Sequence, residues 1–212
     1  LQYLEEVEIQ SDINLEYGRF PVQYVIRPRT EELHDYRGYA GKITSGIFKK
    51  GDKVKVLPSG FSSSIDGIEI TGEKIEEAFA PMSVIIHLAD DIDVSRGDII
   101  VKEENPPEVS RDIEAIVCWM DSKPMSAGHK YLLQHNGKTV KCAVREVIYE
   151  IDINTFDEIP NTEAITLNDI CKVKIKTASP LSFDPYKKNK ANGSFILIDE
   201  NTNITAGAGM IC

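Results

Sequence analysis

The residues of this sequence that could do chemistry are few and widely spaced. Its four histidines are His34, His87, His129 and His135. Apolar runs and turns separate them, so their spacing does not favour a metal site. Adjacent carboxylates such as Asp90-Asp91 lie in turns or on opposite faces of a strand, and nothing predicts that they face each other across a substrate. We therefore predict no catalytic residue and no metal site.

Nucleotide-binding motifs are also missing. There is no Gly-x4-Gly-Lys-Ser/Thr loop, no Gly-x-Gly-x-x-Gly and no Gly-x-Ser-x-Gly. The segment Asn189-Lys190-Ala191-Asn192 resembles the guanine-reading Asn-Lys-x-Asp of GTPases, but it has Asn where a carboxylate should accept from the base. We interpret it as an ordinary loop and expect no cofactor site in this chain.

The cysteines do not form a metal or redox motif either. No Cys-x-x-Cys pair exists among the 4 cysteines. Because Cys118, Cys142 and Cys171 all lie in apolar runs, we predict that they are small buried thiols.

Length, composition and charge limit the classes of protein that remain. A chain of 212 residues with 42% hydrophobic and 27% charged residues is typical of two globular domains. The net charge of −10 is spread over both halves, so nucleic acid is not an expected partner. No apolar run approaches the roughly 20 residues that span a bilayer, and the first residues do not form a signal peptide. These features predict a cytoplasmic protein without membrane contact.

The elements that would position any site are β-strands. From Arg19 onward, short alternating apolar runs are broken by Gly, Pro, Asn and Asp, a pattern typical of an all-β barrel or sandwich. The prolines of Asn105-Pro106-Pro107 cannot continue a sheet ladder and mark a boundary. We expect four segments. They are a connector at 1–18, a first β unit at 19–104, a linker at 105–112 and a second β unit at 113–212.

Three local patterns make sharper predictions. Gly51 and Asn136-Gly137 predict tight hairpin turns. The apolar positions of 139–151 change phase within one run, which predicts a β-bulge near Arg145 and Glu146. The alternating lysines of 169–176 could bind anions, but they are more typical of the solvated face of a half-buried strand.

One hairpin resembles a known superfamily. The segment Gly41-x-Ile43-x-x-Gly46-x-Phe48-Lys49-x-Gly51-Asp52-x-Val54 is similar to the start of the second domain of elongation-factor-type GTPases. The second unit resembles their third domain, with Ser126-Ala127-Gly128-His129 near its start and Ala206-Gly207-Ala208-Gly209-Met210-Ile211 at its end. This resemblance implies two antiparallel β-barrels.

Within that superfamily, ordered segments from one end of the chain to the other resemble the large subunit of bacterial sulfate adenylyltransferase. They include Arg19-Phe20-Pro21-Val22-Gln23-Tyr24-Val25, Asp93-Val94-Ser95-Arg96-Gly97-Asp98, Asp152-Ile153-Asn154-Thr155, Phe183-Asp184-Pro185-Tyr186 and Gly193-Ser194-Phe195-Ile196-Leu197-Ile198-Asp199. Such an enzyme joins sulfate to the adenylyl group of ATP on a small catalytic subunit, and the large subunit couples GTP hydrolysis to that step.

The resemblance also implies what lies outside the sequence. The GTPase domain of the family, which binds GTP and Mg²⁺, would precede residue 1, so we expect an excised fragment that has no activity alone. The expected partners of the fragment are that GTPase domain and the small subunit, which binds ATP. The large and small subunits are expected to form a heterodimer. Two other interpretations stay open: tRNA-binding barrels of a translation elongation factor, and an adaptor that works without an enzyme.

Three arginines in family-like turns are candidates for contact with another domain or subunit. They are Arg27, Arg37 and Arg96. The alternative is that each satisfies turn carbonyls or nearby acids, as exposed arginines often do.

Overall fold

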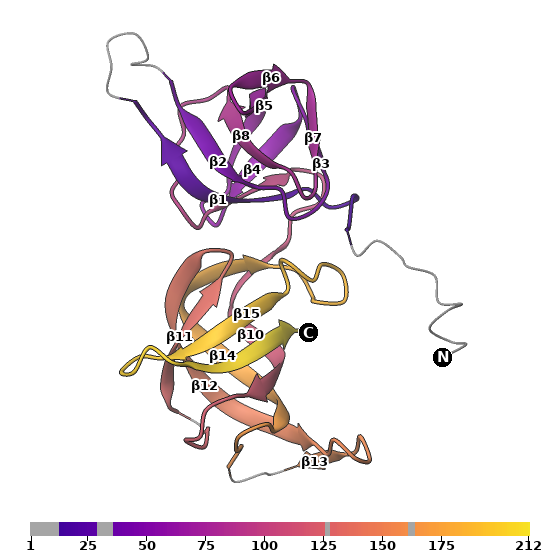
Figure 1. Cartoon of the computed structure of the whole chain (residues 1–212), viewed down its shortest axis with the longest axis vertical. Helices are drawn as coiled ribbons and strands as arrows, with labels where there is room; N and C mark the ends of the chain where they lie inside the picture. The colour runs from indigo at the N-terminus through magenta and orange to yellow at the C-terminus, as the bar shows by residue number, and fades with distance from the viewer. Residues whose placement is uncertain (1–12, 29–35, 126–127, 161–163) are drawn as a thin grey trace, which may run out of the picture.

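The computed structural model describes residues 13–28, 36–125, 128–160 and 164–212. In these ranges the chain forms sixteen β-strands and no helix. The strands build two closed antiparallel barrels that follow one another along the long axis of the molecule (Figure 1). The all-β prediction with two antiparallel barrels is confirmed.

The first barrel contains nine strands. They are β1 (Arg19–Ile26), β2 (Gly38–Lys42), β3 (Ile47–Lys49), β4 (Lys53–Leu57), β5 (Phe61–Ile70), β6 (Glu73–Ile75), β7 (Glu77–Phe79), β8 (Ser83–Leu88) and β9 (Ile99–Lys102). The sheet order is β4-β9-β1-β2-β8-β5, and pairing of β4 with β5 closes the barrel. Strand β6 extends the sheet beyond β5, while β3 and β7 form a separate ladder.

The second barrel contains seven strands. They are β10 (Glu108–Trp119), β11 (Lys130–His135), β12 (Lys138–Ile151), β13 (Glu158–Pro160), β14 (Ile170–Phe183), β15 (Ser194–Asp199) and β16 (Thr205–Ile211). The order is β11-β15-β16-β10-β14-β12, closed by the pairing of β11 with β12. Strand β13 adds to the end of β12, where Glu150 lies opposite Ile159.

The predicted turns and bulge are present. Gly51 has a φ of 88°, and Asn136 and Gly137 have φ of 48° and 78° in the hairpin between β11 and β12. A φ above zero at both central residues gives this turn the twist of the flanking strands. The register of β12 against β14 shifts between Val144 and Glu146, as the phase change predicted.

Each barrel has its own apolar core, which is filled by the inward-facing side chains of its alternating strands. In the first barrel Phe20, Tyr39 and Phe48 are fully buried. In the second, Trp119 is 1% exposed, packs edge-on against Tyr131 and donates from Nε1 to the Lys123 carbonyl at 2.8 Å. Burial of each such side chain contributes on the order of 1.5–3 kcal/mol.

The cysteine prediction is right for two of the three thiols. Cys142 and Cys171 are buried, but Cys118 is exposed on β10. The run that contains Cys118 is apolar at both inward and outward positions, so alternation could not tell which way the thiol points.

Some expectations fall on residues outside the described ranges. Of the predicted connector only 13–18 are described, and Ser126 and Ala127 are not. Among the described residues, no helix is long and apolar enough to cross a bilayer.

Candidate partner-contact site and barrel junction

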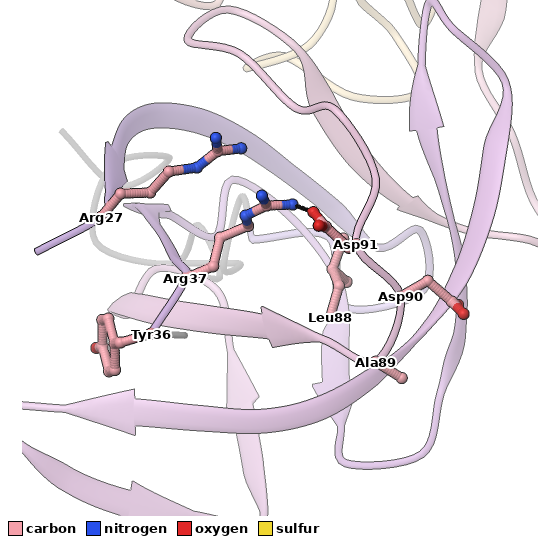
Figure 2. Close-up of a pocket in the computed structure, with 7 residues that line it drawn as sticks. All are labelled: Arg27, Tyr36, Arg37, Leu88, Ala89, Asp90 and Asp91. Carbon is pink, nitrogen blue, oxygen red and sulfur yellow. Dashed lines mark ion pairs between the residues drawn. The ribbon is translucent and has the colours of Figure 1, made fainter. Parts of the chain in front are cut away.

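The pairing of the first two strands brings Arg27 and Arg37 to one place. Ile26, the last residue of β1, lies opposite Gly38, the first residue of β2. The arginines that flank this pair therefore meet at the same end of the barrel. Figure 2 shows both side chains on one side of a shallow hollow of about 380 Å³, which Asp91 also lines.

The two arginines differ in their contacts. Arg37 forms an ion pair with Asp91 and donates from Nη1 to the Ile92 carbonyl at 3.2 Å. The Arg27 side chain is exposed and forms no ion pair or hydrogen bond with any residue that the structure describes. Arg37 is thus held by its own barrel, whereas Arg27 keeps its donors available to another molecule.

A half-buried polar cluster holds the backbone at Arg37. The Tyr36 hydroxyl donates to Glu69 at 3.1 Å, and burial and this hydrogen bond raise the pKa of Tyr36. The Nδ1 atom of His87 lies 2.8 Å from the Arg37 carbonyl. Its Nε2 atom is 3.1 Å from Glu69, close enough for an ion pair when the ring is protonated, although the angle does not give a hydrogen bond.

Arg96 lies elsewhere, in the turn before β9. The next residue, Gly97, has a φ of 90°, and a Cβ at Gly97 would lie 3.0 Å from the Cβ of Lys138 in the second barrel. The turn therefore touches the other barrel. The structure brings Arg27 and Arg37 together but does not bring Arg96 to them.

A buried ion pair that was not among the predicted contacts joins the two barrels. Arg19, the first residue of β1, is fully buried and donates to Asp184 from Nε at 2.8 Å and from Nη2 at 2.9 Å. Its Nη1 donates to the Asn105 carbonyl at 2.8 Å. A two-pronged guanidinium–carboxylate pair fixes orientation as well as distance. The two barrels are therefore held in one relative orientation.

Amides of the loop after Asp184 complete this junction. Asn192 donates to Asp184 at 2.7 Å, and Asn189 donates to the Ser45 hydroxyl of the first barrel at 2.7 Å. Asn14 donates to the Lys188 carbonyl at 3.0 Å. The loop 189–192, which looked unremarkable in the sequence, joins the two barrels.

The electrostatics of the junction favour the ionised pair. Burial by itself raises the pKa of Asp184, but the hydrogen bonds from Arg19 and Asn192 outweigh it and hold that pKa below the ordinary value of an aspartate. The only sequence signal for this role was the Phe183-Asp184-Pro185-Tyr186 segment, in which an acid stands among apolar residues.

The described residues contain no group of three or more potential ligands that could hold a metal ion. The arrangement therefore offers a charged hollow at one end of the first barrel and a rigid junction, and both suit contact with another molecule.

Comparisons with known proteins show what the chain resembles. A family model described as GTP-eEF1A C-terminal domain-like matches residues 112–212. The chain is 43% identical over 212 residues to the bifunctional enzyme CysN/CysC of Mycobacterium tuberculosis (strain ATCC 25618 / H37Rv), covering 100% of the chain and 34% of that protein. It is 44% identical over 211 residues to sulfate adenylyltransferase subunit 1 of Bacteroides fragilis (strain YCH46), covering 100% of the chain and 43% of that protein.

The chain thus spans less than half the length of these curated relatives. A crystal structure of sup35 complexed with GDP superposes with a TM-score of 0.82 at 17% identity, covering 99% of this chain and 50% of that one. The match to sup35 bears on the fold alone. The matches to the curated relatives confirm the resemblance that the sequence segments indicated.

Proposed function

Because every part of this chain matches sulfate adenylyltransferase subunit 1, we propose that the chain is the pair of β-barrels of such a GTPase subunit. In this proposal a GTPase domain that binds GTP and Mg²⁺ precedes residue 1. Its hydrolysis of GTP drives the formation of adenylyl sulfate from ATP and sulfate on a small catalytic subunit that binds the ATP. The barrels make no bond themselves, and the assembly works in the cytoplasm.

The 44% identity over the whole of this chain carries the proposal. The junction between the barrels supports it because it explains how the two barrels could move together. A unit that transmits a nucleotide signal must move as one body, because a flexible joint would dissipate the change in orientation. The buried pair of Arg19 and Asp184 supplies that rigidity. The two barrels then act together as a lever between the GTPase domain and the partner.

We further propose that Arg27 receives a carboxylate from another domain or subunit. It is exposed, and it lies beside an arginine whose own charge is already paired. In this proposal Arg37 shapes the hollow, and the turn that contains Arg96 contributes to the contact between the two barrels. The net charge of −10 argues that the partner is a protein rather than nucleic acid.

Co-purification tests this function. The chain, tagged, is mixed with the small subunit, and the dissociation constant is measured at several salt concentrations. We expect binding, and we expect Arg27→Ala to weaken it several-fold with a smaller salt dependence, because a rim charge acts mainly through long-range attraction. Arg111→Ala, which removes an exposed arginine of the second barrel, is the matched control. Equal binding by the Arg27 and Arg111 variants would contradict contact between Arg27 and the small subunit, and no binding by the parent chain would contradict the function.

The alternative is a translation factor whose barrels bind aminoacyl-tRNA, which the elongation-factor-type fold keeps open. A gel shift with aminoacyl-tRNA at low salt separates the two. Binding that falls steeply with salt would favour the alternative, and the net charge of −10 leads us to expect none.

A further inference from the structure

One outer row across four strands of the second barrel lacks the polar side chains that a solvent-facing sheet normally carries. Ile151 lies opposite Ile170, Ile170 lies opposite Cys118, and Cys118 lies opposite Ala208. Cys118 and Ala208 are exposed, and the two isoleucines are half-buried. Side chains directly opposite one another on adjacent strands are in contact. An uncharged row therefore crosses four strands on the outside of the barrel.

The row continues into a projecting arm formed by the end of β12, the loop 152–157 and β13. In that loop Ile153 is 61% exposed and Phe156 is 79% exposed. The Asp152 carboxylate accepts the backbone amides of Asn154 and Thr155 at 2.7 and 3.3 Å. Phe156 has a φ of 63°, which is unfavourable for an aromatic residue. The loop is hydrogen-bonded, so its phenyl ring is held in solvent at an energetic cost.

We call the row and the two arm side chains the apolar patch. It comprises Cys118, Ile151, Ile153, Phe156, Ile170 and Ala208. Scattered exposed apolar residues are ordinary, but a continuous row that ends in an exposed aromatic is typical of an interaction surface.

Further along the same strands, the outward-facing positions look as those of solvent-facing strands normally do. Lys174 is paired with Glu146 at 2.9 Å and Lys176 with Asp112 at 2.7 Å, all four partly exposed. The sequence thus places ion pairs along one part of this outer face and apolar side chains along another. This difference within one barrel indicates that the apolar patch is covered when the protein is at work.

The charges around the apolar patch indicate the chemistry of what covers it. Five acids surround it. They are Glu114, Glu150, Asp152, Asp157 and Glu158. Lys172 is a neighbouring cation; it lies opposite Ile116 and is paired with Glu114 at 3.4 Å. A complementary partner would present an apolar pocket with Lys or Arg at its rim.

The position of the arm favours a separate chain as the occupant. Figure 1 shows β13 at the end of the second barrel that is remote from the first barrel. Ile13, the first described residue, lies in a groove with Lys188 and Ala191 at the junction end of that barrel. A domain joined to the chain through Ile13 is therefore tethered at the junction, away from the arm.

We propose that the apolar patch is the docking surface for the catalytic partner subunit, with Phe156 inserted in an apolar, basic-rimmed pocket of that subunit. This inference rests on the proposed function, whose partner it places. An exposed aromatic anchor of this kind commonly contributes a large share of the binding energy of an interface.

Two measurements test the docking surface. Affinity for the purified small subunit is compared between the parent chain, Phe156→Asn and Phe61→Ser. Asn tolerates a positive φ, so the first variant keeps the loop, and Phe61 is a control aromatic that is 52% exposed on the first barrel. Separately, the labelling rate of Cys118 by a thiol reagent is followed in a Cys212→Ser background, which leaves Cys118 as the single exposed thiol.

We expect Phe156→Asn to weaken binding at least tenfold, Phe61→Ser to leave it unchanged, and the partner to slow Cys118 labelling at least tenfold. Equal melting temperatures of the two variants show that folding is not the cause. If the parent binds, but Phe156→Asn does not weaken binding and the partner does not slow Cys118 labelling, the proposed docking surface is refuted and the proposed function stands. If the parent does not bind, both are wrong. If Cys118 is already protected in the full-length subunit alone, its own chain covers the patch and the assignment to the partner is overturned.

Discussion

Replacing Asp184 with Asn tests whether one buried ion pair unites the two barrels. The substitution keeps the shape of the side chain and removes its charge. Arg19 would remain with 0% of its side chain exposed, facing an amide that cannot accept from both Nε and Nη2. Its remaining acceptors would be the carbonyls of Gly18 and Asn105, at 2.9 and 2.8 Å. The guanidinium would thus keep half of its contacts and lose its counter-charge.

The expected loss is large because the partner charge stays buried. Removing one member of a buried pair typically costs about 3–5 kcal/mol, whereas an exposed pair contributes about 0–1 kcal/mol. For a chain of this size, a loss of ~3–5 kcal/mol corresponds to a fall in Tm of roughly 6–20 °C. The matched control is Asp112→Asn, which removes the partner of Lys176 in a pair with side chains 41% and 73% exposed.

Chemical denaturation of both variants, followed by tryptophan fluorescence and by a probe in the first barrel, provides the measurement. We expect Asp184→Asn to lose several kcal/mol and to separate the transitions of the two barrels, with Asp112→Asn close to the parent. A low folded-state pKa of Asp184 stabilises the protein above the unfolded pKa of about 4, and this contribution disappears as the pH falls through the folded value. The variant should therefore lose less stability on acidification. Equal losses in the two variants would refute the reasoning.

Two further predictions concern the second barrel. Burial raises the pKa of the Cys142 and Cys171 thiols to about 12, so we expect a thiol reagent at pH 8 to leave both unmodified in the folded chain while Cys118 reacts. Mass spectrometry of the labelled peptides identifies the modified cysteines. Rapid labelling of Cys142 and Cys171 as well as Cys118 would contradict their burial. A methyl group at Gly209 would collide with the Phe195 ring, so Gly209→Ala should lower stability by about 1–3 kcal/mol. The control is Gly67→Ala, whose added Cβ would make only an ordinary contact with His87 at 3.7 Å, and a Gly209→Ala variant as stable as the parent would show that the ring can move aside.

Most of the strands could be predicted because the alternation and turn residues that define a strand lie within a few residues of one another. The alternation of 171–176 and the turn at Asn136-Gly137 each carry their signal within a few residues. The bulge in β12 and the solvated lysines followed the same logic, whereas the closure of the strands into two barrels was implied by the family resemblance. The division into segments at 18, 104 and 112 stays a prediction.

The junction could not be predicted in this way. Arg19 and Asp184 are 165 residues apart, and both residue types are normally exposed, so no local pattern pairs one with the other. The apolar patch was hidden for a related reason. Around Cys118 both faces of β10 are apolar, and a period-2 pattern that is apolar on both faces no longer says which side is outside. Sites where two parts of a protein meet break the rules that work inside each part.

The order in which the strands pair has a consequence for synthesis on the ribosome. The first barrel is complete once β9 joins β1 and β4, whereas the second needs β16 to enter between β15 and β10. A chain made from its N-terminus would therefore carry one finished barrel for the time needed to make roughly 100 residues, about 5–20 s. During that interval the guanidinium of Arg19 has no counter-ion and faces water. The early barrel tolerates this because a solvated arginine costs nothing, and burial begins only when Asp184 arrives with the second barrel.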